Sequence, residues 1–316
     1  MAQQKGWFGL YYVDGAFSNH VDEALATGAS LYHAYMFYGY WKGEKYASGP
    51  RKGMVDEEAW RARAELCLKR AAPKFPHILV ALAMDVTRQD QSGVQYDPYA
   101  SLNSIKTHLS LAAPYWDQVV MVDLADEPGS KGGVNPWDKR NTKDMVAKVR
   151  GAMDALGLPR KLCMITYTVA QSLEQDAITI APPSAGGRGC DAVGLELFTR
   201  PNKGREANKK AIKVQAEAAR ARLHEKQKVV YVLQAFDRNG AWDSTGTFGQ
   251  SIELGELNWD GYKIGEGSDR TVGYLAFNLA RPNTPPKPKG GALWYPNVTK
   301  AHVRIIQRMK EKGLYL

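Results

Sequence analysis

The sequence contains few of the residues that hold small secreted proteins together. Its 316 residues include only three cysteines, Cys67, Cys163 and Cys190. Their odd number and irregular spacing match neither a disulfide framework nor a zinc motif. The six histidines are scattered, and no two of them stand at metal-ligand spacing. We therefore expect free buried thiols, no metal site and no cofactor.

Long apolar runs are absent as well. No apolar stretch reaches the ~18 residues that are needed to span a membrane. Residues 1–13 lack the ordered charged, apolar and cleavage regions of an export signal. We expect no membrane partner, and either a cytoplasmic location or release by a route without a signal. The chain also lacks a Gly-x-Ser-x-Gly elbow, and residues 129–133 lack the Walker phosphate-loop spacing.

Acidic residues are fewer than the basic residues Lys and Arg, which gives the chain a net charge of +9. Much of the excess lies in residues 203–228, a predicted helix whose charges fit a solvated face. A basic protein often meets anions, so an acidic polysaccharide and nucleic acid are both considered as partners. No helix-turn-helix, finger or RNA-binding fingerprint appears. The sequence therefore argues against nucleic acid, and it leaves the oligomeric state open.

Apolar, β-branched segments alternate with amphipathic helical segments along the whole chain. Candidate strands lie at residues 7–13, 31–38, 78–86, 118–124, 161–168, 191–198, 228–236 and 271–278. Candidate helices lie at residues 18–27, 55–74, 98–116, 142–156, 172–180, 206–225, 251–262 and 298–312. In several candidate strands the odd-numbered and the even-numbered positions are both apolar, as in parallel strands that are buried on both faces. Eight strands that each precede a helix predict a single-domain (β/α)8 TIM barrel over residues 1–316.

Most turns from helix to strand are short, whereas the connections after strands are long, as at residues 39–54, 129–141, 238–250 and 281–297. In such barrels these strand-to-helix connections build the active-site face. They carry aromatic rings, which suit the apolar faces of sugars. Core packing is an alternative for Tyr167, and helix capping for Asp85. The candidate ligand-contacting residues are Tyr38, Trp41, Asp85, Tyr167, Gln234, Trp242, Asn278 and Trp294.

The strongest local pattern is the segment at residues 118–129, in which a buried strand ends in Asp126-Glu127-Pro128. Strict alternation places Asp123 and Glu127 on one side of this strand and Asp126 on the other. A carboxyl group at the barrel mouth is partly desolvated and lies near another carboxylate. Both effects raise its pKa toward the value that a general acid needs. The alternative is an acidic helix start, with Asp126 as the cap. His33, inside the second strand, is expected to be a buried histidine, with Asp123 as its candidate partner.

This motif resembles the clan A glycoside hydrolases, whose fourth strand ends in Asn-Glu-Pro with glutamate as acid/base. Here Asp126 stands in place of that asparagine. The adjacent Asp-Glu pair is similar to hexosaminidase-type barrels of families 20 and 123. In those barrels the glutamate is the acid and the aspartate orients the 2-acetamido group of the substrate. Residues 191–198, which include Glu196, resemble a clan A sixth strand. The resemblance implies a glycosidase with Glu127 as acid and an amino-sugar-containing glycan as substrate, while the net charge keeps an acidic glycan open as well.

The seventh strand departs from the clan A pattern, because Gln234 stands where those enzymes place the nucleophilic glutamate. An amide cannot act as a carboxylate nucleophile. Three alternatives stay open. The acetamide of the substrate attacks, or Glu196 or Asp237 supplies the carboxylate, or the barrel binds glycan without cleaving it. The last alternative is a carbohydrate-binding, adhesion or structural module.

Overall fold

Eight parallel strands hydrogen-bond in a closed ring, in the order β1-β10-β9-β8-β7-β6-β3-β2. The computed structural model describes residues 5–10, 18–35, 57–82, 88–89, 95–96, 102–126, 139–168, 182–187, 189–197, 203–234, 249–277 and 296–316. The strands are β1 (Trp7–Leu10), β2 (Leu31–Tyr35), β3 (His77–Ala81), β6 (Val119–Asp126), β7 (Leu162–Thr168), β8 (Ala192–Leu197), β9 (Lys228–Gln234) and β10 (Thr271–Phe277). This arrangement confirms the predicted (β/α)8 TIM barrel.

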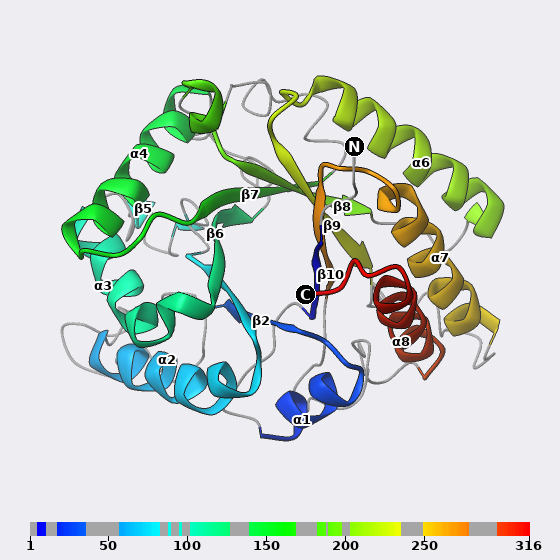
Figure 1. Ribbon diagram of the computed structural model, residues 1–316, viewed down its shortest axis with the longest axis horizontal. Coiled ribbons are helices and arrows are strands. Elements are labelled where there is room, and N and C mark those ends of the chain that lie inside the picture. Colours follow the sequence, from blue (N-terminus) through cyan, green and yellow to red (C-terminus); the bar gives the residue numbers. More distant parts are fainter. Residues whose placement is uncertain are drawn as a thin grey trace.

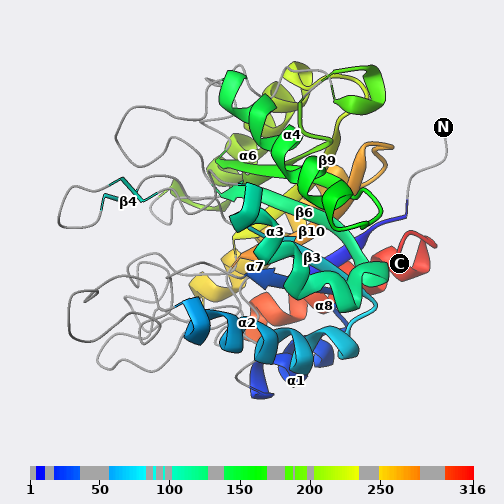
Figure 2. The same cartoon turned by 90° about the vertical axis from the view of Figure 1, so that its left-hand side faces the viewer.

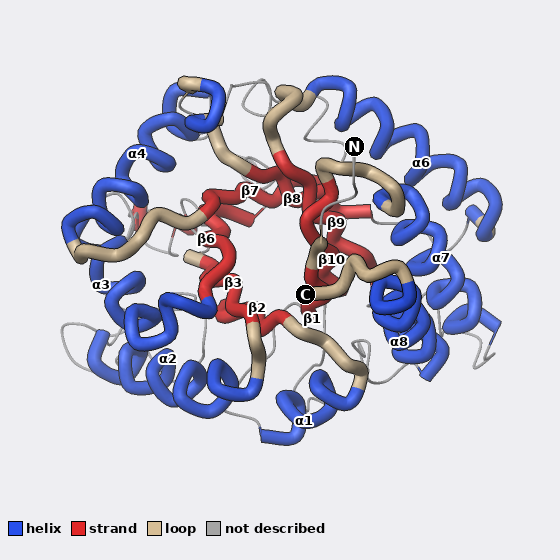
Figure 3. The backbone as a smooth tube through the Cα atoms, viewed as in Figure 1, coloured by secondary structure: helices blue, strands red, loops and turns tan. Residues whose placement is uncertain are grey.

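The described helices surround the strands (Figures 1 and 3). They are α1 (Ser18–Ala26), α2 (Glu57–Ala71), α3 (Leu102–Ala112), α4 (Lys139–Ala155), α6 (Arg205–Arg222), α7 (Gly249–Gly265) and α8 (Pro296–Glu311). Short 3-10 turns are η1 (Ala72–Lys74), η2 (Ala113–Gln118) and η4 (Pro183–Ala185). The helix predicted at residues 172–180 lies outside the described residues. None of the described helices has the length and apolar character needed to cross a membrane.

A small antiparallel pair, β4 (Arg88–Gln89) with β5 (Gln95–Tyr96), follows β3 and stands apart from the barrel. Figure 2 shows β4 at the end of the molecule opposite the marked termini. The strands of the barrel run toward this end, so it is the face from which the strand-to-helix connections leave. This is the face on which barrels of this type carry their active sites.

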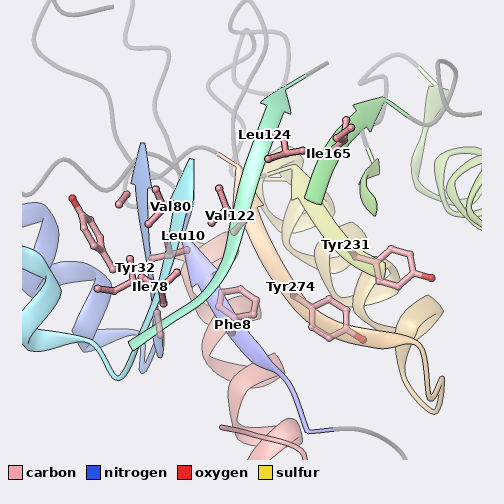
Figure 4. Close-up of a cluster of buried hydrophobic side chains, with 14 of the residues drawn as sticks. Phe8, Leu10, Tyr32, Ile78, Val80, Val122, Leu124, Ile165, Tyr231 and Tyr274 are labelled. Atoms are coloured by element: carbon pink, nitrogen blue, oxygen red, sulfur yellow. The ribbon is translucent and has the colours of Figure 1, made fainter. Parts of the chain in front are cut away.

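Alternating side chains of the strands form two separate apolar clusters, because successive residues of a strand point to opposite sides. The larger cluster lies between the strands and the helices and includes Phe8, Val80 and Val122. Figure 4 shows part of it. The smaller cluster fills the inside of the barrel and includes Met121 and Met164. Both parities of the strands are therefore buried, as the sequence pattern predicts.

Three glycines on the inner wall make room for their neighbours. A Cβ added to Gly273 would lie 2.4 Å from the ring of Trp7, and one added to Gly9 would lie 2.5 Å from Leu31. A Cβ on Gly194 would lie 2.6 Å from the hydroxyl of Thr166. The space beside each glycine is thus already occupied by a side chain.

The basic stretch at residues 203–228 is largely occupied with contacts inside the protein. Arg205 donates to Glu256 and Asp260 on α7 at 3.2–3.4 Å, and Lys209 lies 3.6 Å from Asp260. Arg220 donates to a backbone oxygen near the end of α7. These cations hold α6 against α7. This arrangement gives Arg205, Lys209 and Arg220 a structural role.

Candidate functional site

Five polar side chains stand on the inner wall of the barrel among apolar neighbours. They come from five different strands and are all buried, with exposed fractions of 0–4%. Each lies two or four positions after a residue of the smaller, inner cluster on the same strand, such as Met121, Met164 or Val232. Its side chain therefore points to the same side of the strand as that residue. The five residues are His33 on β2, Asp123 on β6, Thr166 on β7, Glu196 on β8 and Gln234 on β9. We call this group the inner polar set.

Within the inner polar set, Thr166 donates a hydrogen bond from Oγ1 to Oδ2 of Asp123 at 3.2 Å. Thr166 stands in register with Gly194, where a larger residue would displace the threonine hydroxyl. The bond compensates part of the cost of burying the Asp123 carboxylate. Asp123, Thr166 and Gly194 thus form a fixed polar layer below the strand ends.

His33 is fully buried, and this burial lowers its pKa to about 3. Its ring is therefore neutral at neutral pH and does not bring a positive charge into the barrel. It stands on β2, whereas Asp123 stands on β6, with β3 between the two strands. A buried histidine is what the sequence predicted at this position. Its pairing with Asp123 stays a prediction.

The end of β6 departs from simple strand alternation. Asp123 pairs with Met164 on β7, but the next pair along the two strands joins Asp126 to Thr166. Three steps along β6 therefore match two steps along β7, which is the signature of a β-bulge. The sides on which the side chains of Asp126 and Glu127 lie relative to Asp123 stay predictions. Asp126 is the last residue of β6, and Glu127 lies outside the described residues.

Glu196 is the residue next to the end of β8, and only 3% of it is exposed. It stands in register with Thr168 on β7 and with Val232 on β9. Its side chain has the parity of Ala192, which belongs to the inner cluster. A carboxylate is thus held inside the barrel, on the half toward the strand ends.

Gln234 is the last residue of β9 and shares the inward parity of Val230 and Val232. Its backbone oxygen accepts a hydrogen bond from Nδ2 of Asn258 on α7 at 2.7 Å. Oδ1 of Asn258 in turn lies 3.2 Å from Nε2 of His302 on α8. Sequence reasoning missed both Asn258 and His302. A polar residue at a buried helix position was the only available signal.

Tyr167 points the other way. It is fully buried and belongs to the cluster between the strands and the helices, on the side of β7 opposite Thr166. The core-packing interpretation therefore fits this residue, and we remove it from the candidate site. Other predicted residues, Tyr38, Trp41, Asp85, Asp237, Trp242, Asn278 and Trp294, lie outside the described residues together with Glu127. Among the residues that are described, no group of three potential ligands is placed to hold a metal ion.

No protein-family model matches the sequence, and no curated protein matches it. Solved structures do match the fold. An exo-β-1,4-mannosidase from Opitutaceae bacterium strain TAV5 is 10% identical with a TM-score of 0.61, over 98% of this chain and 60% of its own. A β-glucuronidase from an uncultured Clostridium is 12% identical with a TM-score of 0.54, over 96% of this chain and 50% of its own.

Xylanase A from P. fluorescens subsp. cellulosa is 13% identical with a TM-score of 0.51, over 96% of this chain and 98% of its own. The present chain thus spans less than two thirds of the mannosidase and of the glucuronidase, but nearly all of this xylanase chain. At these identities the comparisons establish the fold. The barrel is distantly similar to those of the clan A glycoside hydrolases.

Proposed function

We propose that this barrel acts on glycans as a glycoside hydrolase, with Glu127 as general acid/base. The observation that carries the proposal is Glu196, a carboxylate buried on the inner wall one residue before the end of β8. Burying a carboxylate costs several kcal/mol unless it is compensated. A barrel built only for packing needs no carboxylate on its inner wall. A glycosidase does, because it needs two carboxyl groups at the sugar.

In this proposal Glu127 protonates the leaving oxygen of the glycosidic bond. Asp126, which directly precedes it, orients and stabilises the attacking group. Two routes then remain for attack at the anomeric carbon. Glu196 or Asp237 forms a covalent glycosyl-enzyme, or the 2-acetamido oxygen of the substrate attacks. The buried position of Glu196 favours the covalent route, and the Asp-Glu pair favours the acetamide route.

The substrate is proposed to be a glycan that is acidic or contains amino sugars. The mannosidase, glucuronidase and xylanase named above act on different sugars, so the fold alone does not select one. The aromatic residues of the strand-to-helix connections, Trp41, Trp242 and Trp294 among them, are proposed to stack on sugar rings.

A second candidate function is a barrel that binds glycan without cleaving it. Gln234 favours this candidate, because it stands inward at the end of the seventh barrel strand, where clan A enzymes carry their nucleophile. Its amide can hydrogen-bond sugar hydroxyls but cannot attack the anomeric carbon. In this case the protein would hold a polysaccharide as an adhesion or structural module.

The test is a panel of acidic and N-acetylhexosamine-containing glycans, assayed for released reducing ends and, separately, for binding. We expect the wild-type protein to release sugar with retained anomeric configuration, which NMR of the first product reveals. Glu127→Gln is expected to lower turnover ~100-fold or more, as loss of a general acid does. Glu217→Gln, an exposed change on α6, is the matched control and is expected to leave turnover unchanged.

The two routes of attack give different results in the same assay. If Glu196 is the nucleophile, Glu196→Ala is inactive, and added azide restores turnover with an inverted product. If the acetamide attacks, a thiazoline analogue of the cyclised intermediate inhibits the wild-type protein strongly. Binding across the panel without any release of reducing ends would support the second candidate and contradict the first.

A further inference from the structure

A buried asparagine ties the outer helices to the end of β9. Asn258, in the middle of α7, is 2% exposed. Its Nδ2 donates to the backbone oxygens of Gln234 at 2.7 Å and Leu254 at 2.8 Å. Asparagine is a poor helix former, and an amide is costly to bury. The contact with Leu254 stays within the helix. The contact with Gln234 reaches from α7 to β9, and a leucine at this position has no donor with which to make it.

His302 on α8 continues the chain of hydrogen bonds. Its Nε2 lies 3.2 Å from Oδ1 of Asn258, and its ring lies 5.3 Å from that of Phe8, measured between centroids. Burial lowers the pKa of His302 to about 3, so the ring is neutral and carries a single N–H. Because Oδ1 can only accept, that proton is on Nε2. A flipped Asn258 amide would turn its oxygen toward the oxygen of Gln234, so His302 and Gln234 select the same orientation.

The bond from Asn258 is made at the last pair of β9 and β10 that the structure describes. The register between β9 and β10 ends at Gln234 and Phe277. Gln234 is also the residue of β9 that enters the inner polar set at the barrel mouth. The peptide unit is planar, so a hydrogen bond to its oxygen fixes the plane that follows Gln234. The direction of the Gln234 side chain is then set from outside the barrel.

We propose that Asn258 and His302 are positioning residues, which fix the end of β9 so that the amide of Gln234 faces a carbohydrate at the barrel mouth. The ligand, but not the hydrogen-bonded chain, rests on the proposed function. Neither residue needs to touch the sugar. The chain runs from His302 through Asn258 to the backbone of Gln234, and it crosses from α8 through α7 to β9.

A first experiment needs no ligand. The side-chain amide signal of Gln234 is assigned in ¹⁵N–¹H spectra by its loss in Gln234→Leu. We expect this signal to move in Asn258→Leu and in His302→Leu. We expect it to return toward the wild-type position in His302→Gln, whose amide can again donate to Asn258. An unmoved signal in folded Asn258→Leu and His302→Leu would overturn the proposal. Asn258→Ala replaces the leucine variant if that variant does not fold.

The matched control is Gln227→Leu. Gln227 is also a fully buried amide, but it lies at the opposite end of β9, where it donates to the backbone oxygen of Cys190 at 3.1 Å. Its loss is expected to lower the midpoint of denaturant unfolding without moving the Gln234 signal. If the Gln234 signal moves as far in Gln227→Leu as in Asn258→Leu, the shift reflects a general loss of rigidity. That result would contradict a positioning role for Asn258.

A second experiment uses a glycan that the wild-type protein binds. Loss of the Asn258 donor is expected to weaken binding about tenfold, the equivalent of one hydrogen bond of ordinary strength. Gln227→Leu is expected to bind as the wild-type protein does. If Asn258→Leu binds as tightly as the wild-type protein, the positioning role is wrong while the proposed function stands. If the wild-type protein binds no glycan, the proposed function fails, and the spectral experiment alone decides the positioning role.

Discussion

Glu266, just after the end of α7, contacts three cationic side chains, Lys263, Arg308 and Lys312. Its carboxylate accepts from Tyr262 and Arg308 at 3.1 Å and from Lys312 at 3.0 Å, and it also pairs with Lys263. Burial alone would raise the pKa of Glu266, but these donors outweigh it and lower the pKa to about 2. The charged form is therefore the one that stabilises the folded protein.

From this shift we predict a pH-dependent loss of stability. A folded-state pKa below the unfolded one contributes stability above pH ~4.5, and that contribution is lost as the pH falls toward 2. Glu266→Gln is expected to lower the free energy of unfolding by about 2 kcal/mol at pH 7. The difference from the wild-type protein should shrink steadily below pH 4.5. Denaturant unfolding from pH 7 to pH 3 measures it.

Glu217→Gln is the control for this prediction, because Glu217 is exposed on α6. It should change the free energy of unfolding by less than ~0.5 kcal/mol at every pH. A Glu266→Gln variant whose deficit is the same at pH 7 and at pH 3 would show that the lost stability comes from packing rather than from charge.

Residue-level placement was the part that the sequence predicted least well. Inward parity was predictable for Glu196 and Gln234, because their strands alternate regularly. It is less simple to predict at the end of β6, where the register with β7 shifts between Asp123 and Asp126. A bulge depends on the pairing with the neighbouring strand, and the sequence of one strand does not reveal it. Tyr167 illustrates the same limit, because tyrosine suits both a core and a sugar site.

At the scale of elements, the approach of α7 to the start of α8 depends on a glycine. A Cβ placed on Gly255 would lie 2.6 Å from the backbone oxygen of Asn297, too close for any real contact. The neighbour is backbone, so it cannot rotate away as a side chain can. We predict that Gly255→Ala destabilises the protein by about 1–3 kcal/mol, as overpacking does. Thermal or denaturant unfolding measures this change.

Gly151 in α4 offers the opposite case with the same substitution. A Cβ there meets nothing within 4 Å. Alanine loses less backbone entropy than glycine when a helix forms, so Gly151→Ala should stabilise the protein by about 0.5–1 kcal/mol. Equal effects of the two substitutions would mean that helix propensity, and not the contact with Asn297, governs Gly255.

The elements themselves were predictable, and the reason is physical. All eight barrel strands lie within or close to the ranges predicted from apolar, β-branched segments. Both of their faces are buried, one in each apolar cluster, so the apolar signal is strong. The helices show the matching 3.6-residue period. Irregular connections have no comparable period, and the predicted aromatic contacts such as Trp41 and Trp294 lie outside the described residues.

At the scale of the whole molecule, the three cysteines report on opening of the barrel. Cys67 lies on α2, Cys163 on β7 and Cys190 just before β8, and all three are free and buried, as expected. Burial raises the pKa of Cys163 and Cys190 to about 12. We predict that a water-soluble thiol reagent modifies the native protein on the order of a thousandfold more slowly than the unfolded one.

Mass spectrometry of peptides taken at intervals measures the three rates separately. Equal rates at Cys67 and Cys163, which lie on different sides of the barrel, would indicate that one global opening exposes both. Rapid modification of any one cysteine in the native protein would contradict its burial.

The seam between β1 and β10 imposes an order on folding. The hydrogen bond from Tyr315 to the backbone of Gly28 joins residues 287 positions apart, and Gly6 bonds to both Leu314 and Leu316. Closing so long a loop in an unfolded chain costs about 5 kcal/mol of entropy. No single hydrogen bond, at about 1 kcal/mol, offsets this cost. The intervening strands must shorten the path first, so β1 can pair with β2 early but with β10 only when almost the whole chain has folded.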